Sequence, residues 1–470
     1  MSLNNYCKLK NIHFIGIGGI GMSAIAEVMF HSGYIISGSD QASNSITTKL
    51  SSIGITVNIG HAASHVSGAD IVVVSSAIGQ DNIEFSTAKS MQIPIFSRAE
   101  MLAELMRSKF SIAIAGTHGK TTTSSLIAHI FKQAKLKPGY IIGGILGNTN
   151  TNAEYGDSDF LITEADESDG SFTLLKPMLA AITNIDNDHM EAYSHSEDSL
   201  QQSFLQFIHN LPFYGSIVIC GDDPGINSIR DKIYRPIVSY GLQSGNMITA
   251  SDIKHSGTSS NFTVSIKGSD TFAVQLNMPG KHNIFNTLAA IAIADICQIP
   301  HDVIAQAIQS FSGVGRRFEK LGDHCFNGNK VTVIDDYGHH PKEINVTIAA
   351  AREAYLGRRL VMVFEPHRYS RTKELWQDFI TALSLADLVI VTDIYAASEV
   401  AIAGIDSASL VSSLQKHSTT KALYCSQENL LALLQQQLRQ EDVLIFQGAG
   451  GISKNCRQLL ANLPVDEYAS

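Results

Sequence analysis

A glycine-rich turn followed by a lysine and three threonines is the segment of this sequence best suited to chemistry. Residues 111–123 read SIAIAGTHGKTTT. The apolar run predicts a buried strand, and Lys120 stands where a helix is expected to begin. Such a turn holds phosphate through backbone N–H groups and a lysine charge, and the Thr121 hydroxyl can bind Mg²⁺. The general P-loop pattern has glycine where this chain has Ile114. The alternative is a purely structural glycine turn.

A second glycine loop, at residues 16–21, follows an apolar strand pattern and opens a helix pattern. Asp40 follows the next expected strand, at about the distance of a ribose contact. Taken alone, this fingerprint indicates a dinucleotide such as NAD. The physics requires only a pyrophosphate at a helix N-terminus and an acid beside a hydroxyl, so a UDP-sugar also fits. A glycine turn without a ligand is the structural alternative.

Two polar clusters follow expected strands in the central region. The acidic segment 164–169 follows the strand at 160–163, where ligands of parallel sheets gather, and Glu164 could hold Mg²⁺ beside the P-loop. His189 follows the strand at 180–185 and is a candidate metal ligand on the same rim. The alternatives are a solvated acidic surface and a structural histidine.

Asn283 and Asn286 are spaced to share one face of a helix expected at 284–298. Amides there could read an adenine edge, but asparagine near a helix start is usually a cap, and the residues alone favour the cap.

The last region carries two clusters that combine histidine with other polar residues. One follows an expected strand at 331–334 and contains residues 335–341; the other follows a strand at 360–364 and contains residues 365–371. Arginine can clamp a carboxylate or phosphate in a bidentate fashion, so the pair favours an anionic or zwitterionic ligand. Surface ion pairs are the alternative for either cluster alone. The glycines at 448–451 are expected to form a simple turn.

The elements that must position these residues alternate strand and helix, which predicts an α/β fold. Further strands are expected at 11–15, 34–37, 71–75, 93–96, 216–220, 388–391 and 443–446. A hairpin is expected around residues 267–270. We place domain boundaries near 107 and 312, which gives domains 1–107, 108–312 and 313–470.

Composition limits the class of protein. At 470 residues the chain should hold about three domains. A net charge of −10 argues against a general nucleic-acid binder. The six cysteines lie far apart with no CxxC pair, so neither a zinc knuckle nor a disulfide framework is indicated. No leader pattern or membrane-length apolar run is present, which favours a cytoplasmic protein without membrane insertion.

The ordered set of motifs resembles the Mur ligase family over essentially the whole chain. The segments that carry the resemblance are HFIGIGGIGMSAIAE, AGTHGKTTT, EADESDGSF, TNIDNDHMEAY, MPGKHNIFN, GVGRRFE, DDYGHHP and EPHRYSRT. The resemblance implies three domains: a Rossmann-like UDP-sugar domain, a P-loop ATPase with a parallel sheet and a small antiparallel hairpin, and a Rossmann-like C-terminal domain that helps to bind an amino acid.

The resemblance also implies an activity in peptidoglycan precursor synthesis. The members most similar to this chain join L-alanine to the lactyl carboxylate of UDP-N-acetylmuramate, through an acyl phosphate made with ATP and Mg²⁺. The partners implied are these small molecules, with no nucleic acid, and a monomer or weak homodimer is expected. A sister enzyme that attaches an intact tripeptide to the same nucleotide is the nearest competitor.

Site residues follow from the resemblance, position by position. The catalytic set is Lys120, Glu164 and His189, and the metal ligands are Thr121, Glu164 and His189. The ATP site comprises Gly116, Thr117, His118, Gly119, Lys120, Thr121, Thr122, Asn283, Asn286, Asp336 and Arg317, with Arg316 as an alternative to Arg317. The UDP-sugar site comprises Gly18, Gly19, Ile20, Gly21, Asp40, His61 and Ser76. The amino-acid site comprises Tyr337, His339, His367, Arg368 and Arg371. The chain has no clear equivalent of the carbamylated lysine found in some members.

Two other classes stay open from the residues. A nicotinamide oxidoreductase would use the loop at 16–21 but leaves Lys120 and the acidic segment unexplained. A nucleotide-dependent switch would bind ATP and a cell-wall intermediate without catalysis, and the cluster at His367 and Arg368 argues against it.

Overall fold

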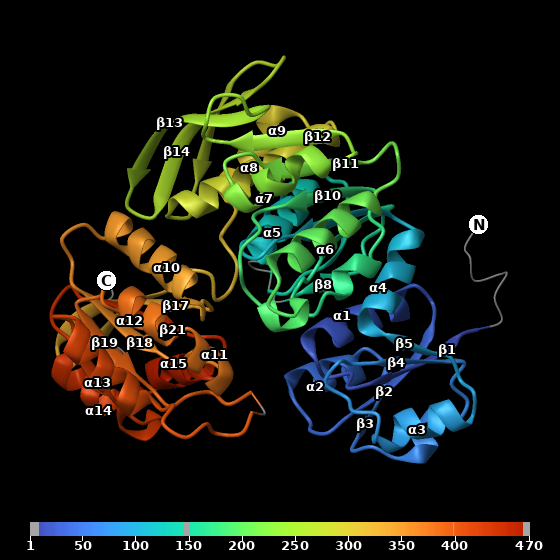
Figure 1. The fold of residues 1–470 in the computed structure, drawn as a ribbon, viewed down its shortest axis with the longest axis horizontal. Coiled ribbons are helices and arrows are strands. Elements are labelled where there is room, and N and C mark those ends of the chain that lie inside the picture. Colours follow the sequence, from blue (N-terminus) through green and yellow to red (C-terminus); the bar gives the residue numbers. More distant parts are fainter. Residues whose placement is uncertain (1–8, 145, 147–150, 398, 464–470) are drawn as a thin grey trace. The chain divides into compact units, whose positions relative to one another are not determined.

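The computed structural model describes residues 9–144, 146, 151–397 and 399–463 (Figure 1). The chain divides into two compact units. The first contains the chain up to residue 251 together with 263–274 and 285–311. The second contains residues 252–262, 275–284 and the chain from 312 onward.

The N-terminal sheet has five parallel strands in the order β3-β2-β1-β4-β5. The strands are β1 (Asn11–Ile15), β2 (Ile35–Asp40), β3 (Thr56–Ile59), β4 (Ile71–Val74) and β5 (Ile95–Ser97). The helical segments are α1 (Ile20–His31), α2 (Ser45–Ser52), η2 (Ala63–Val66), α3 (Ile83–Ser90) and α4 (Arg98–Arg107). Figure 1 shows α1 and α4 on one side of this sheet and α3 on the other. The strand order reverses between β1 and β4, which is where ligands bind in such sheets.

The central sheet has ten strands in the order β15-β14-β13-β12-β11-β10-β6-β9-β7-β8. The strands are β6 (Phe110–Ala115), β7 (Gly139–Ile141), β8 (Ala153–Glu154), β9 (Phe160–Glu164), β10 (Leu179–Ile182), β11 (Ser216–Cys220), β12 (Ile237–Gly241), β13 (Ile248–Ser256), β14 (Ser259–Ile266) and β15 (Phe272–Leu276). β6 lies between β10 and β9, parallel to both. β6 and β10 are almost fully buried, and apart from Ser111 in β6 both consist of apolar residues.

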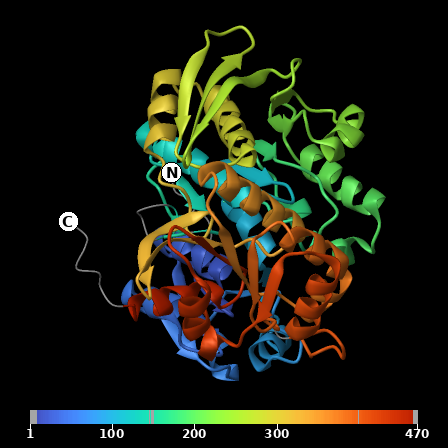
Figure 2. The ribbon, with the colours of Figure 1, turned by 90° about the vertical axis from the view of Figure 1, so that its left-hand side faces the viewer.

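The helical segments of the central region are α5 (Lys120–Gln133), η4 (Ser171–Leu174), η5 (Met190–Tyr193), α6 (Glu197–His209), α7 (Pro224–Ile229), η6 (Arg230–Lys232), α8 (Lys281–Ile296) and α9 (His301–Ser310). Figure 2 shows β13 and β14 as two long yellow-green strands, which lie next to β15 at one end of the sheet order. The predicted hairpin is confirmed as a pair of neighbours, β14 and β15, and β7 with β8 adds an antiparallel pair that the sequence did not indicate.

The C-terminal sheet has the order β16-β17-β21-β18-β19-β20, and only the β16–β17 pair is antiparallel. Its strands are β16 (Glu319–Phe326), β17 (Asn329–Asp336), β18 (Leu360–Phe364), β19 (Leu388–Val391), β20 (Lys421–Tyr424) and β21 (Val443–Gln447). Its helical segments are α10 (Pro341–Ala354), α11 (Tyr369–Glu374), α12 (Trp376–Leu383), α13 (Ser407–His417), η7 (Gln427–Asn429), α14 (Leu430–Gln437) and α15 (Ile452–Ala461).

Both faces of the C-terminal sheet are covered. Along β18, Leu360, Met362 and Phe364 face a core formed with α10, α12 and α13. The alternate residues Val361 and Val363 face a second core formed with α14 and α15. This two-sided burial explains why β18 is apolar throughout.

Several sequence predictions are corrected by the structure. The strand expected at 180–185 ends at Ile182, because the next residues leave the sheet to bind the P-loop. Helix α8 begins at Lys281 rather than 284, so neither Asn283 nor Asn286 is its N-cap. The described cysteines are free thiols, and Cys7 lies outside the described residues. Among the helices that the structure describes, none combines the length and apolarity that crossing a bilayer requires.

Candidate functional site

The loop between β6 and α5 has the shape expected of a phosphate-binding turn. Gly116 has φ +124° and Gly119 has φ +84°, a region of backbone space that favours glycine. A Cβ atom at Gly116 would lie 2.2 Å from Thr183 Oγ1, and one at Gly119 would lie 2.3 Å from Asn286 Oδ1. Both glycines are therefore required by space as well as by backbone conformation. Thr121 and Thr122 are buried in the first turn of α5.

Residues at the end of β10 brace this turn. The His118 N–H donates to Asn184 Oδ1 at 2.9 Å, and Asn184 Nδ2 donates back to the His118 carbonyl at 2.9 Å. The Thr183 hydroxyl donates to the same carbonyl at 2.5 Å, and the Asp186 N–H donates to Thr117 Oγ1 at 2.9 Å. The turn is thus held by the side chains of Thr183 and Asn184, which directly follow β10, and by the backbone N–H of Asp186.

Lys120 folds back under the turn. Its Nζ donates to the carbonyls of Gly116 (2.7 Å) and Thr117 (3.3 Å) and to Glu167 Oε2 at 2.6 Å. Glu167 is 1% exposed, and no donor among the described residues reaches its Oε1. Glu167 was not singled out from the sequence, because the acidic segment offers four carboxylates and only the fold shows which one meets Lys120.

The electrostatics of this cluster follow from burial and opposite charge. Burial lowers the pKa of Lys120, but Glu167, Asp166 and Glu164 outweigh it, and the net pKa is raised. Burial raises the pKa of Glu167 to about 7, against the opposing effect of Lys120. Lys120 therefore stays charged at neutral pH, while Glu167 can exchange a proton there.

Glu164 ends β9, beside the P-loop strand β6, in register with Ile114. Its Oε1 accepts the Gly143 N–H at 2.7 Å and the Ser124 hydroxyl at 3.3 Å. Glu164 is thus placed on the rim that the sequence predicted.

The donor set suits a magnesium ion that arrives with phosphates. Within the described part of the chain, no three His, Cys, Asp or Glu side chains converge as a metal cluster. Mg²⁺ needs no such cluster, because it usually takes one or two carboxylates, substrate phosphates and waters. A carboxylate at Glu164 and a hydroxyl at Thr121 fit that requirement.

His189 lies in the loop before η5. Its backbone has φ 56°, its N–H donates to Asp188 Oδ1 at 2.8 Å, and its Nε2 lies 3.6 Å from Asp188 Oδ2. The element that follows is tied to the acidic segment, because the Tyr193 hydroxyl donates to the Glu167 carbonyl. His189 thus belongs to a loop that Tyr193 joins to the acidic segment, and its place beside Lys120 and Glu164 stays a prediction.

Of the two asparagines on α8, the structure places Asn286 against the P-loop, where its side chain fills the space beside Gly119. Asn283 is buried and donates from Nδ2 to the Pro279 carbonyl at 2.8 Å. This bond anchors the start of α8.

The N-terminal glycine loop is held by the end of β2. The N–H groups of Gly16 and Ile17 donate to the Ser39 carbonyl at 2.8 and 3.0 Å, and the Gly18 N–H donates to Asp40 Oδ2 at 2.8 Å. Helix α1 then begins at Ile20, with Gly19 as its N-cap. In this structure the Asp40 carboxylate, which we expected at a ribose, supports the loop.

Three further residues lie at or near the same strand ends. Ser76 follows β4 and is exposed, beside the point where the strand order reverses. Ile20 is 53% exposed.

Arg98, which the sequence analysis did not single out, begins α4, and a Cβ at Gly21 would lie 3.1 Å from its Cδ. Burial raises the pKa of Asp166, but Lys120, Ser168 and Arg98 together lower it. The Arg98 side chain thus lies beside Gly21, and its charge contributes to lowering the pKa of Asp166.

His61 follows β3 and lies beside a buried carboxylate, that of Glu84. Glu84 is fully buried, and burial raises its pKa, but hydrogen bonds from His13, Ser39, His65 and Ala62 lower it to about 2. Glu84 was not predicted, because its partners come from three segments that are far apart in the sequence.

In the second unit, two arginines flank one tyrosine. The guanidinium carbons of Arg316 and Arg317 lie 4.7 and 5.0 Å from the centre of the Tyr337 ring. Arg316 Nη2 also donates to the Gly448 carbonyl at 2.7 Å, and Arg317 Nη1 lies 3.7 Å from Glu343 Oε1.

Asp336, predicted at the ATP ribose, is 7% exposed and is used within the protein. Its oxygens accept hydrogen bonds from the backbone N–H groups of Phe318 and Gly338 and from the side chains of Thr347 and Gln447. Burial raises its pKa despite Arg317. In this structure Asp336 serves to hold the end of β17.

The predicted amino-acid residues gather within the second unit. The His339 ring lies 5.6 Å from the Tyr337 ring and 5.5 Å from the His367 ring, and Arg371 Nη1 lies 3.5 Å from His367 Nδ1. The neighbouring Arg368 has φ 71°, and its N–H donates to the Tyr395 carbonyl at 2.8 Å. Burial, His339 and the two arginines lower the pKa of His367 to about 4, so this ring is neutral at pH 7.

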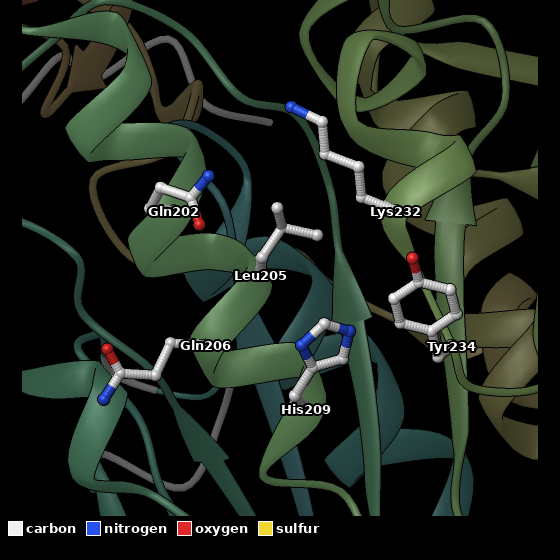
Figure 3. A pocket seen from close by; sticks show the side chains of 6 residues that line it. All are labelled: Gln202, Leu205, Gln206, His209, Lys232 and Tyr234. Atoms are coloured by element: carbon white, nitrogen blue, oxygen red, sulfur yellow. The ribbon is translucent and has the colours of Figure 1, made fainter.

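A separate pocket of about 470 Å³ lies beside α6 (Figure 3). Its lining residues are Gln202, Leu205, Gln206, His209, Lys232 and Tyr234. The rings of His209 and Tyr234 stack with centres 5.7 Å apart. None of the predicted site residues lines this pocket.

Three sequence profiles of one family match the chain in order. They are described as "Mur ligase family, catalytic domain" over residues 11–110, "Mur ligase middle domain" over 114–294 and "Mur ligase, glutamate ligase domain" over 316–450.

Relatives and solved structures agree with the profiles. The UDP-N-acetylmuramate–L-alanine ligase of Psychrobacter arcticus is 46% identical over 97% of this chain and 95% of that protein. The structure of UDP-N-acetylmuramate–alanine ligase from Thermotoga maritima superposes with a TM-score of 0.81, at 29% identity, over 96% of this chain and 98% of that one. A murein peptide ligase from Psychrobacter arcticus, at 24% identity, has a TM-score of 0.72 over 97% of this chain and 100% of that one, and it shares the fold.

Proposed function

The chain belongs to the Mur ligase family, and from this premise we propose that it joins L-alanine to UDP-N-acetylmuramate at the expense of ATP. The observation that carries the proposal is the 46% identity to a UDP-N-acetylmuramate–L-alanine ligase over nearly the whole length of both chains. Family membership favours a UDP-sugar over NAD at the glycine loop of residues 16–21. The product is an amide used in peptidoglycan synthesis.

The reaction has two chemical steps. A lactyl carboxylate oxygen attacks the γ-phosphorus of ATP, which forms an acyl phosphate and releases ADP. The alanine amine then attacks the acyl carbon, and the tetrahedral intermediate expels phosphate and loses the amine proton to form the amide. Both steps bring anions together, so positive charge is required where the phosphoryl group moves.

Lys120 supplies that charge in this proposal. It lies in the phosphate-binding turn and stays protonated because carboxylates surround it. The P-loop residues with Asn286 support an ATP site, since the turn and this amide are packed together. Mg²⁺ bound to Glu164 and Thr121 would neutralise phosphate charge, with His189 as a further candidate ligand.

The amino-acid site is assigned to Tyr337, His339, His367, Arg368 and Arg371. A zwitterion needs a cation for its carboxylate, which Arg371 can provide. It also needs a neighbour that does not repel its ammonium group, and the neutral ring of His367 meets that need. The domain boundaries near 107 and 312 remain part of the proposal, supported by the limits of the three profile matches.

Product analysis tests this function. We would incubate the purified protein with ATP, Mg²⁺, UDP-N-acetylmuramate and a mixture of free amino acids and the peptidoglycan tripeptide, and analyse the products by mass spectrometry. The expected product is UDP-N-acetylmuramoyl-alanine, formed with one ADP and one phosphate. Exclusive attachment of the tripeptide would assign the sister activity instead, and phosphate release without any amide would favour a nucleotide-dependent switch.

A further inference from the structure

Glu84, in the first turn of α3, is a buried carboxylate to which the proposed reaction gives no role. It is 0% exposed, and polar groups from three segments surround it: β1, β2 and residues 61–65. An ionised carboxylate is retained in such a place only when donors replace its water.

Each oxygen of Glu84 has its own donors. Oε1 accepts from the Ala62 N–H at 3.2 Å and lies 2.6 Å from His65 Nδ1. Oε2 accepts from the Ser39 hydroxyl at 2.5 Å and lies 3.4 Å from both His13 Nε2 and His61 Nδ1. The carboxylate therefore joins the end of β2 to the segment that follows β3.

These contacts determine which ring nitrogen of His61 carries the proton. The Ser39 hydroxyl has one hydrogen, which it donates to Glu84, so its oxygen can only accept from His61 Nδ1, 3.1 Å away. Both neighbours of His61 Nδ1 are then acceptors, and Nδ1 must carry the proton. In the neutral ring, Nε2 is left with a lone pair.

His61 Nε2 is buried, and no partner for it exists among the described residues. A buried acceptor without a donor is costly and calls for an explanation. The backbone ties His61 to the glycine loop, because the Gly60 N–H donates to the Asp40 carbonyl at 2.8 Å and Asp40 accepts the Gly18 N–H. The Ser39 carbonyl also holds Gly16 and Ile17.

We propose that Glu84 is a positioning residue for the uridine nucleotide, which it serves by holding His61 as the Nδ1–H tautomer. His61 Nε2 then accepts a hydrogen bond from an N–H or O–H of the uridine. This inference rests on the proposed function, because it takes the UDP-sugar as the ligand of the N-terminal sheet.

The Glu84→Gln variant tests the positioning role. Its amide can donate to His61 Nδ1, which shifts the ring toward the Nε2–H tautomer and removes the acceptor. We expect UDP to bind about tenfold more weakly by calorimetry, the loss of roughly one hydrogen bond, with ATP affinity unchanged. The matched control is Glu27→Gln, which removes a carboxylate paired with Lys49 in the same domain and should leave both affinities unchanged. UDP affinity in Glu84→Gln equal to that of the wild type would overturn the proposal.

The tautomer itself can be measured without turnover. Nitrogen NMR on histidine-labelled full-length protein, assigned with the His61→Gln variant, should show His61 with its proton on Nδ1 before UDP is added and a shifted Nε2 signal afterwards. A proton on Nε2 in the wild-type protein at pH 8 would refute the inference. If the wild type binds no UDP, the proposed function fails, while the free-state signal still tests the link between Glu84 and His61.

Variants of His61 keep the inference testable if Glu84→Gln does not fold. His61→Phe removes the acceptor and should weaken UDP binding about tenfold, whereas His61→Gln, whose amide oxygen can replace Nε2, should recover part of the loss. Comparing UDP with 3-methyl-UDP and 2′-deoxy-UDP identifies the donor, because the analogue that lacks it gains nothing from His61. If His61→Phe binds UDP as tightly as the wild type, the inference is wrong.

Discussion

The ammonium group of Lys120 lies 2.6 Å from the carboxylate of Glu167, beneath the turn proposed to hold the phosphates of ATP. The Glu167 carboxylate is the anion that pairs with Lys120 in this structure. A γ-phosphate would compete with Glu167 for the same ammonium group. If the turn binds ATP as proposed, the nucleotide gains access to this ammonium group either by displacing the Glu167 carboxylate or after Glu167 is protonated.

Replacing the lysine tests its role in chemistry. Lys120→Ala should lower the rate of amide formation by on the order of 10²–10³ or more, because a positive charge is lost where negative charge moves. UDP-sugar binding should persist, since the glycine loop is held by Ser39 and Asp40 rather than by Lys120. Turnover by mass spectrometry and UDP binding by calorimetry measure the two effects. Substantial ligation by this variant would remove Lys120 from the mechanism.

Glu167 predicts a pH dependence of ATP binding. Its raised pKa of about 7 means that the carboxyl gains a proton as pH falls from 8 to 6, which removes negative charge near the phosphates. ATP affinity should therefore rise several-fold over this range. Titration of ATP-induced fluorescence or heat at each pH would detect the change. In Glu167→Gln the dependence of ATP affinity on pH should fall to the part caused by titration of ATP itself. An unchanged pH dependence of ATP affinity would contradict the assignment.

Arg371 is expected to act on the amino acid. Arg371→Ala should raise the KM for alanine by on the order of tenfold or more, because a charge-assisted hydrogen bond is worth about 1.5–3 kcal/mol. The KM for ATP should change little. Arg352→Ala, which breaks a surface pair with Asp387 in the same sheet domain, is the control. Equal alanine dependence in wild type and Arg371→Ala would exclude Arg371 from the site.

Glu84 should affect stability in a pH-dependent way. Its folded-state pKa of about 2 lies below the ordinary value of 4.5, so it contributes stability above pH 4.5 that is lost as pH falls toward 2. The contribution is on the order of 3 kcal/mol. The difference in melting temperature between wild type and Glu84→Gln should be full at pH 6 and shrink at pH 3. A difference in melting temperature that grows as the pH falls would show that the ionised Glu84 carboxylate does not stabilise the fold.

The sequence predicted most of the strands that position the sites. The strand predictions at 216–220, 360–364 and 388–391 match the structure to the residue, because these strands are buried on both faces and read as apolar runs. β13 was not predicted, since it is largely exposed and its sequence, ITASDIKHS, has no apolar alternation. β16 was not predicted either, because it carries charged residues and a glycine; it pairs antiparallel with β17 at the sheet edge.

Local geometry was predictable where one motif determines it, and contacts between residues far apart in the sequence were not. The turn at 116–119 and Lys120 were found from local spacing alone. Glu167, Arg98 and Glu84 were missed, because each acquires its role only from residues in other segments, such as His61 for Glu84. Asp336 is the opposite case. It was predicted to bind the ATP ribose, but its oxygens accept hydrogen bonds from four groups of the protein.

Thr183 and Asn184 fix the P-loop through bonds that need no nucleotide. The loop is thus pre-organised. The conformational entropy that ordering the loop costs is lost when the protein folds, not when ATP binds. ATP capture should then proceed in a single kinetic phase, whereas loosening the loop with Asn184→Ala should add a slower rearrangement after the encounter.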